Sequence, residues 1–383
     1  MNCDDFPMLK KDIIYLDNGA TTLKPQCVID KIKDYYENYS ANAHRGDYDI
    51  SFKVDQEYEN TRELVRKFIH AKYKEEIVFT SGATQSLNMI AFGFFGKFLE
   101  PGDEILITQS EHASNVLPWF VLQKKLGVIV RYIPLDSNHY VTIENVRDAI
   151  TPHTKVISLA GITNVLGDER PMKEICKLAH ERNIFVVMDA AQSVGHRKID
   201  VEEIDVDFLA FSGHKMCGPT GVGVLYGKKK LLEEMEPQNF GGGMNESFDN
   251  ADEIYLKELP TRLEAGTPNI AGVIGLGEAI KYLDSIGMER IAEYEKNLRK
   301  YAINKLIDIP YIDILNLESD SGIISFNVDG VFSQDVAYYL NKYNLCVRAG
   351  NHCAKILKEE VGVSNSLRVS LYFYNTESDI DAL

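Results

Sequence analysis

The stretch FSGHKMCGPTGVG, residues 211–223, decides how the rest of the chain is interpreted. An apolar run leads into it (DVDFLAFSG) and another follows it (GVGVLYG), and both runs are typical of buried strands. Lys215 is therefore expected in a short connection between two strands, among glycines and a proline, and not on a surface helix. A lysine held rigidly in this way is a candidate for covalent chemistry.

The composition is typical of a globular chain with about two or three domains' worth of residues. The 383 residues are 45% hydrophobic and carry a net charge of −16. So acidic a chain gains little from phosphate contacts, and we predict no nucleic-acid binding. We expect no membrane span, since no apolar run reaches 18 residues. The acidic N-terminus does not resemble a secretory signal, which favours a cytoplasmic protein.

The cysteines favour free thiols in a reducing compartment. They are irregularly spaced and form no CxxC pair. A zinc site from Cys346, His352 and Cys353 is an alternative, but it lacks a recognisable ligand spacing, and we expect no metal. The six cysteines are Cys3, Cys27, Cys176, Cys217, Cys346 and Cys353.

The order of the segments predicts an α/β fold. Strand and helix patterns alternate from about residue 55 to 230, which is typical of a mainly parallel sheet covered by helices on both faces. Such sheets bind ligands beyond the C-terminal ends of their strands. We expect strands at 75–80, 103–108, 128–135, 154–162 and 183–190, and helical segments at 81–94, 110–127 and 170–183.

A smaller α+β domain is expected after the sheet. A long helical run covers 272–306, and strand patterns follow at 322–328 and 366–374. We assign residues 26–265 to a large domain, and residues 1–25 and 266–383 to a small one.

Two strand ends carry residues suited to a charged ligand. In TSGAT, the hydroxyls of Ser81 and Thr84 lie at a glycine turn and a helix start, which suits an anion and equally an ordinary capped turn. Asp189 ends an apolar strand, with Gln192 three residues later. A carboxylate there costs stability unless it is paired, although a helix N-cap is the alternative reading.

Together with Lys215, these features are what pyridoxal phosphate needs. The lysine forms a Schiff base, Asp189 keeps the ring nitrogen protonated, and the glycine turn holds the phosphate. Ser212 and His214 could add phosphate contacts, and His112 could cover the face of the ring.

A second group of candidate residues surrounds Cys353 in VRAGNHCAK, residues 347–355. The polar, glycine-containing loop favours a reactive thiol over an inert core cysteine, with Arg348 and His352 as possible sources of positive charge. Arg368 lies on an apolar strand. Its planar fork suits the α-carboxylate of an amino acid, although an internal salt bridge is the alternative.

These residues stand within segments that resemble the class V, fold-type I pyridoxal-phosphate enzymes, most closely the SUF-type cysteine desulfurases. The matching segments follow the order of that family over nearly the whole chain. They are YLDNGATT (15–22), NAHRGDYDIS (42–51), TSGATQSLN (80–88), SEHASNVLPW (110–119), TNVLG (163–167), MDAAQS (188–193), FSGHKMCGPTGVG (211–223), GGGM (241–244), EAGTPN (264–269) and RAGNHCA (348–354).

The resemblance implies a role for each candidate residue. Lys215 would bind the cofactor covalently and shuttle protons, and Cys353 would attack the substrate sulfur. His112 would stack on the ring, with Asp189 at its nitrogen and Gln192 at its phenolic oxygen. The remaining assignments are Ala83, Thr84, Ser212 and His214 around the phosphate, Thr267 at the phosphate of the neighbouring subunit in a homodimer, and Asn164, Arg348 and Arg368 at the substrate.

The function implied is release of alanine from L-cysteine, with a persulfide left on Cys353. The short cysteine segment implies that a small SUF-type acceptor protein collects the sulfur. Iron–sulfur cluster assembly is the expected destination, with thio-modified RNA or cofactors as alternatives. Asn351 departs from the family, where a histidine usually stands. Alternatives are a selenocysteine lyase, another class V lyase or aminotransferase, and an inactive scaffold with this fold.

Overall fold

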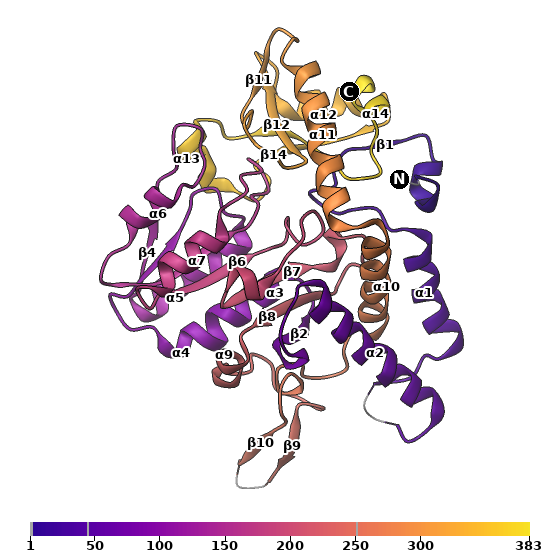
Figure 1. Cartoon of the computed structure of the whole chain (residues 1–383), viewed down its shortest axis with the longest axis vertical. Coiled ribbons are helices and arrows are strands. Elements are labelled where there is room, and N and C mark those ends of the chain that lie inside the picture. The colour runs from indigo at the N-terminus through magenta and orange to yellow at the C-terminus, as the bar shows by residue number, and fades with distance from the viewer. Residues whose placement is uncertain (1–2, 44–45, 250–251) are drawn as a thin grey trace.

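The computed structural model describes residues 3–43, 46–249 and 252–383, and a seven-stranded sheet lies at its centre (Figure 1). β8 runs antiparallel to both of its neighbours, and the remaining pairs are parallel, so the predicted mainly parallel α/β sheet is confirmed. In spatial order the strands are β2 (Ile77–Thr80), β8 (Gly223–Gly227), β7 (Phe208–Ser212), β6 (Phe185–Asp189), β5 (Thr154–Ala160), β3 (Glu104–Ile107) and β4 (Ile129–Tyr132).

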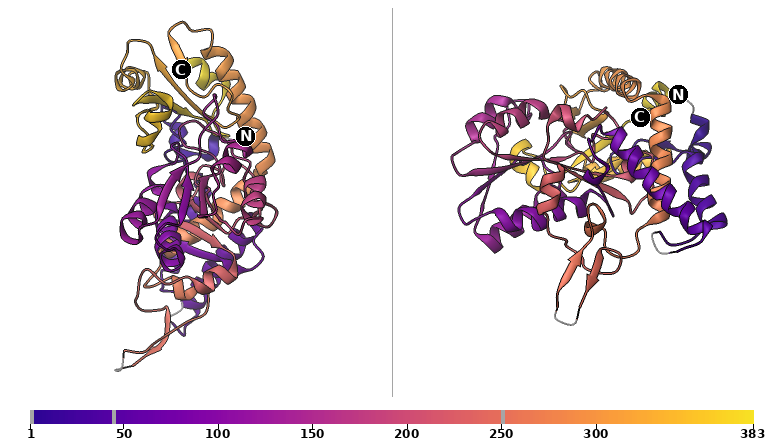
Figure 2. Two further views of the ribbon diagram at one scale, coloured as in Figure 1. Left: turned by 90° about the vertical axis from the view of Figure 1, so that its left-hand side faces the viewer. Right: turned by 60° about the horizontal axis from the view of Figure 1, so that its bottom comes forward.

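Both faces of this sheet are buried, because its side chains alternate between two apolar cores. Along β6, Val186 and Met188 belong to one core and Val187 to the other. The nearly continuous apolar strands of the sequence follow from this double coverage. Helices supply the covering layers on either side (Figure 2).

The helices of this body are short apart from three long ones. α1, α2 and α10 pack together at one side of the sheet and share the larger core with it. The α-helices of this body are α1 Gln26–Asn38, α2 Asp49–Phe68, α3 Ala83–Asn88, α4 Gly96–Phe98, α5 Leu117–Leu126, α6 Ile143–Ala149, α7 Met172–His180, α8 Val201–Ile204, α9 Lys229–Glu234 and α10 Ile270–Ile286.

A four-stranded antiparallel sheet lies at the end of the molecule where both termini are found (Figure 1). Its apolar face packs against residues of α11, α12 and α14, including Leu298, Leu340 and Ile380. The order is β11 (Ile312–Ile314), β12 (Ile323–Val328), β15 (Ser366–Ser370) and β14 (Arg348–Gly350), and the helices are α11 Met288–Leu306, α12 Ser333–Asn341, α13 Lys358–Val361 and α14 Glu377–Ala382.

The beginning of the chain lies beside this small sheet and contributes to a separate two-stranded sheet. β1 (Ile14–Tyr15) pairs in parallel with β13 (Leu345–Cys346), and Asp17 forms a bridge with Ser370 just after it. The Leu16 N–H donates to the Cys346 carbonyl at 2.9 Å, and the Leu16 carbonyl accepts from the Ser370 N–H at 2.7 Å. The first and last parts of the sequence therefore build one surface.

Several element boundaries differ from the expectation. The helical run at 272–306 is two helices, because Gly287 between them has φ +93°. The segment after β2 is α3 followed by a π-helical stretch, Met89–Phe95. The strand expected over 366–374 ends at Ser370, where the chain turns and the Asn375 side chain accepts the Tyr372 N–H at 2.9 Å.

The division into domains at residue 265 stays a prediction.

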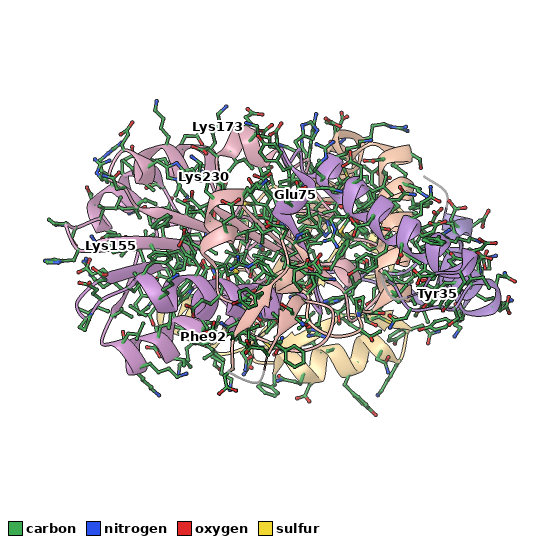
Figure 3. The ribbon with its side chains drawn as sticks, turned by 90° about the horizontal axis from the view of Figure 1, so that it is seen from below. Tyr35, Glu75, Phe92, Lys155, Lys173 and Lys230 are labelled. Carbon is green, nitrogen blue, oxygen red and sulfur yellow. The ribbon has the colours of Figure 1, made fainter. Side chains whose placement is uncertain are left out.

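A two-stranded hairpin, β9 (Asn245–Phe248) and β10 (Ile254–Leu256), projects from the main body (Figure 1). Charged side chains cover much of the exterior, and the labelled Lys155, Lys173 and Lys230 are exposed (Figure 3). Within the described ranges, no helix has the length and apolarity to cross a bilayer.

Candidate active site

A cavity of about 200 Å³ lies where β5, β6 and β7 end, as the fold predicts. Ala160, Asp189 and Ser212 are the last residues of these strands, and all three line it. Apart from Thr267 and the candidate hydroxyl of Ser81, every predicted site residue is found on its wall. These are Ala83, Thr84, His112, Asn164, Asp189, Gln192, Ser212, His214, Lys215, Arg348, Cys353 and Arg368.

Lys215 ends a single 3-10 turn between β7 and β8, which confirms the expected short connection. The carbonyl of the preceding His214 accepts from the Thr22 N–H and from Lys24 Nζ, both at 3.0 Å. Burial lowers the pKa of Lys215 to about 8, and nearby arginines add to this effect. A fixed lysine with this pKa can give up and take back a proton near neutral pH.

Asp189 is a buried carboxylate facing the same cavity. Its Oδ1 accepts the Ala191 N–H at 3.0 Å, and burial raises the pKa of Asp189 to about 6. Gln192 is fixed beside it, because its Nε2 donates to the Gly19 carbonyl at 2.8 Å. A cationic ring nitrogen would stabilise the ionised carboxylate.

The glycine turn after β2 is built as a close backbone approach. Gly82 has φ +154°, and a Cβ on Gly223 would stand 2.4 Å from the Gly82 Cα, so neither position accepts a side chain without a shift. Ser212 Oγ accepts the Ala83 N–H at 2.8 Å, which joins the turn to the end of β7. Thr84 Oγ1 lies 2.7 Å from Ser114 Oγ. Hydroxyl and amide groups suited to a phosphate therefore converge here.

His112 is a neutral ring on the cavity wall. Its Nδ1 accepts the Ser114 N–H at 3.1 Å, and burial lowers its pKa to about 4, with Lys215 and Arg368 adding to the effect. An uncharged ring fixed from one edge is suited to packing against a flat cofactor.

The Cys353 loop is held on several sides although the thiol is exposed. The Cys353 carbonyl accepts the Ala113 N–H at 2.8 Å, and the His352 carbonyl accepts from Asn164 Nδ2 at 2.7 Å. The Cys353 N–H donates to Asn351 Oδ1 at 3.1 Å. The loop is thereby tied to the segments that carry His112 and Asn164.

His352 does not supply the positive charge that its position beside the thiol suggested. Burial lowers its pKa to about 3, and its Nε2 lies 3.0 Å from the Ser366 carbonyl. The zinc alternative also finds no support in this arrangement. In the part of the chain that the structure describes, no three His, Cys, Asp or Glu side chains are grouped to hold a metal.

Arg368 forms the internal salt bridge that the sequence left open, and its role at a substrate carboxylate stays a prediction. It forms an internal salt bridge, since its Nη2 lies 3.1 Å from Asp17 Oδ1, and its Nη1 donates to the Asn164 carbonyl at 2.9 Å. Its Nε is buried without a hydrogen-bond partner among the described residues. Arg348 Nε lies 3.2 Å from Asp17 Oδ2. The sequence analysis assigned no role to Asp17, although this residue lies in the family-like segment 15–22.

The wall also presents polar atoms that lack partners. Among the described residues, Asn164 Oδ1 and Arg368 Nε are buried, unpaired and part of side chains that line the cavity. Such groups are costly to bury, so a ligand is expected to pair with them. With Lys215, Asp189 and the glycine turn, these residues fit pyridoxal phosphate and the carboxylate of an amino acid.

A buried ion pair supports the wall from behind and was missed by the sequence analysis. Arg170 Nη1 contacts Glu111 Oε1, and both side chains are completely buried. Glu111 also accepts the Ala160 N–H at 2.8 Å, and it directly precedes His112. The pair therefore joins the end of β5 to the ring-facing segment. Glu111 lies in a loop, and no local pattern in the sequence distinguishes such a buried acid from an ordinary surface charge.

Glu111→Gln is expected to lower the free energy of unfolding by about 3 kcal/mol, because it removes one of the two carboxylates that pair with the buried Arg170 and leaves Asp168 to balance that charge. Urea unfolding of the variant and the parent measures this difference. The matched control is Glu203→Gln, which removes an exposed pair with Lys173 and should leave the midpoint unchanged. Equal midpoints for all three proteins would contradict the proposed support.

Three neutral histidines predict a loss of stability in acid. Burial lowers the pKa of His112 and His214 to about 4 and of His352 to about 3. The unfolded chain, with histidine pKa values near ~6.5, binds more protons below that pH, so these histidines make stability fall as the pH falls to about 4. Asp189 opposes this, since its raised pKa gives the native state an extra proton.

His352→Gln is therefore expected to flatten the acid side of the stability curve. The slope of unfolding free energy against pH should fall by about 1.4 kcal/mol per pH unit, the contribution of one proton. Urea unfolding of the cofactor-free protein between about pH 4.5 and 6.5 measures it. The exposed His153→Gln serves as control, and an unchanged slope in His352→Gln would contradict burial of the neutral ring.

Comparison with known proteins identifies the family of the chain. The aminotransferase class-V family model matches residues 14–383, so the chain belongs to that family. Family membership makes it a pyridoxal-phosphate enzyme, in agreement with the predicted cofactor.

Its relatives place it more narrowly. A protein of Halalkalibacterium halodurans named "Probable cysteine desulfurase" is 43% identical over 99% of this chain and 94% of the relative. The apo structure of the Thermococcus onnurineus cysteine desulfurase is 37% identical, with a TM-score of 0.95 over 99% of this chain and 94% of that one. The Escherichia coli cysteine desulfurase CsdA is 35% identical, with a TM-score of 0.94 over 100% and 96%. The predicted resemblance to cysteine desulfurases is confirmed.

Proposed function

We propose that this chain removes sulfur from L-cysteine and receives it on Cys353. The observation that carries the proposal is a single cavity lined by an exposed thiol, a buried carboxylate, a lysine and a buried arginine. Family membership alone would allow other reactions of amino acids. The thiol on the cavity wall favours attack on sulfur.

The polar groups of the wall divide the work of this reaction. Arg368 binds the substrate carboxylate, and Lys215 takes the proton from Cα and later returns a proton to the product. Asp189 holds the proton on the ring nitrogen. Bound pyridoxal phosphate supplies the electron sink that stabilises the charge developing at Cα.

Sulfur transfer then occurs between two sulfur atoms. The Cys353 thiolate attacks the substrate sulfur, so an S–S bond forms as the Cβ–S bond breaks. The electron pair of the broken bond goes to the carbon side, and protonation there gives alanine. Cys353 is left as a persulfide, and no outside oxidant or reductant is needed for this step.

The exposed position of Cys353 on a tied loop supports transfer to a separate acceptor. A loop fixed by neighbouring segments cannot carry sulfur over a long distance, so the acceptor must come to it. We infer a small SUF-type acceptor protein, with iron–sulfur cluster assembly as the destination of the sulfur. We further propose that the chain is cytoplasmic. We also propose that it consists of a large domain at 26–265 and a small domain formed by residues 1–25 and 266–383.

Thr267 supports a homodimer in this proposal. It is exposed and does not line the cavity of its own chain, and Asn42 Nδ2 lies 3.5 Å from its hydroxyl. A role at phosphate therefore requires the cavity of a second subunit. Thr267→Val should weaken cofactor binding by about tenfold through loss of one charge-assisted hydrogen bond.

Cofactor titration and sedimentation of the holoenzyme test this together. The expected result is a dimeric parent and a dimeric variant with weaker cofactor binding. A monomeric parent with full cofactor occupancy would contradict the shared site. The matched control is Thr261→Val on the same connecting segment.

The experiment that tests the proposed function measures alanine and sulfide from L-cysteine, using cofactor-loaded protein and a reductant. Equal amounts of both products are expected. Absence of turnover with L-cysteine but turnover with L-selenocysteine would favour a selenocysteine lyase. Inactivity with both, despite bound cofactor and an added acceptor, would favour the scaffold alternative.

A further inference from the structure

We propose that Asp17 is a positioning residue that holds Arg348 and Arg368 together as one carboxylate-binding unit. The inference rests on the proposed function, because it concerns how the substrate of that reaction is held. It assigns a role to a residue from the opposite end of the sequence. Three observations carry it: the strand register, the bridging contacts and the unpaired donor on Arg368.

The register of the small sheet creates an electrostatic problem. β14 and β15 are antiparallel, and Arg348 stands directly opposite Arg368. Like charges that face one another across such a pair repel, and Arg368 is also almost fully buried. Burial lowers the pKa of Arg368, and Arg348 adds to this effect while Asp17 opposes it. The arrangement therefore needs a negative partner.

Asp17 is that partner and reaches both guanidinium groups. Its Oδ1 lies 3.1 Å from Arg368 Nη2, and its Oδ2 lies 3.2 Å from Arg348 Nε. The backbone of Asp17 is fixed, since it bridges Ser370 on β15 and its carbonyl accepts the Ala20 N–H at 3.1 Å. The carboxylate is thus delivered by the N-terminal segment and not by the sheet itself.

The geometry leaves donors directed to the substrate. Both arginines line the cavity, and Arg368 Nε is buried without a partner among the described residues. Two guanidinium groups with one carboxylate carry a net charge of +1, which one substrate carboxylate neutralises. Asp17 thereby fixes the orientation of Arg368 and matches the site to one carboxylate.

Asp17→Asn is expected to weaken binding of L-alanine by about tenfold or more, because the neutral amide no longer holds the guanidinium groups of Arg348 and Arg368 in one orientation. Alanine is the carboxylate-bearing product, and ethylamine is the same molecule without the carboxylate. Titrations of holoenzyme with each ligand, followed by the visible cofactor spectrum, give both affinities. Ethylamine affinity should stay unchanged, so the ratio of the two affinities falls.

Two further variants make the result specific. Asp12→Asn changes another acid of the N-terminal segment, which contacts Asn344, and should leave the ratio unchanged. In an Arg348→Met background, Asp17→Asn should have a smaller effect, because the bridge no longer exists. An unchanged ratio in Asp17→Asn, or an equal loss for alanine and ethylamine, would overturn the proposal.

The titration is independent of turnover. It requires only bound cofactor, so it can be read even if the parent protein releases no alanine from cysteine. Failure of the parent to act on cysteine would count against the proposed function. A parent that acts on cysteine beside an Asp17→Asn variant with an unchanged affinity ratio would count against the role of Asp17 alone.

Discussion

Lys215→Ala is expected to abolish the covalent link to the cofactor and to reduce turnover of L-cysteine by about 10³-fold or more. The lysine is the one amine on the described cavity wall, and the connection that carries it is fixed through the His214 carbonyl. No other lining side chain can replace both its nucleophilic nitrogen and its proton transfer. The visible spectrum and the rate of alanine release measure the two losses.

The appropriate control is Lys24→Met. Lys24 contacts the same turn through the His214 carbonyl but does not line the cavity. That variant should retain the spectrum of the lysine-linked cofactor even if its stability decreases. A normal spectrum in Lys215→Ala would move the covalent role to another lysine.

Cys353→Ser is expected to keep the cofactor and lose persulfide formation. The hydroxyl is a far weaker nucleophile than a thiolate, so sulfur transfer should fall to the uncatalysed level. Gel-shift labelling of persulfides after incubation with L-cysteine measures the loss, and the visible spectrum reports that the cofactor remains bound.

Cys346→Ser provides the matched comparison, because Cys346 lies on β13, only two residues before β14, and does not line the cavity. It should label like the parent protein. Undiminished labelling of Cys353→Ser would assign the sulfur to a different cysteine. The buried Cys217, whose pKa burial raises to about 12, would be a poor alternative nucleophile.

The central strands and the cofactor residues were predictable because local patterns determine them. Apolar runs ending in polar residues marked β6 and β7, and parallel strands bring such ends to one edge. That rule predicts that Asp189 and Lys215 line the same cavity, as they do. The roles of the individual site residues remain predictions that the variants above test.

Long-range contacts could not be predicted in the same way. Asp17 lies in a short segment with no pattern that indicates its partners, and it contacts Arg368 only because the segment after β1 lies beside β15. Glu111 lies in a loop, and its buried contact with Arg170 depends on the fold and not on a local pattern. The end of β15 at Ser370 likewise depends on the Asn375 side chain.

The contact between the N-terminal segment and β15 also determines the order in which parts of the fold can form during synthesis. The strands of the central sheet are complete once Gly227 has been made, whereas Arg368 and Ser370 are made only later, with β15. At translation speeds of about 5–20 residues per second, this interval is roughly 7–28 s. We expect the nascent chain to be able to form the strand ends at Asp189 and Ser212 during that time, whereas Asp17 cannot form its bridge until β15 is made. Recognition of the substrate carboxylate is thus postponed until β15 has been made.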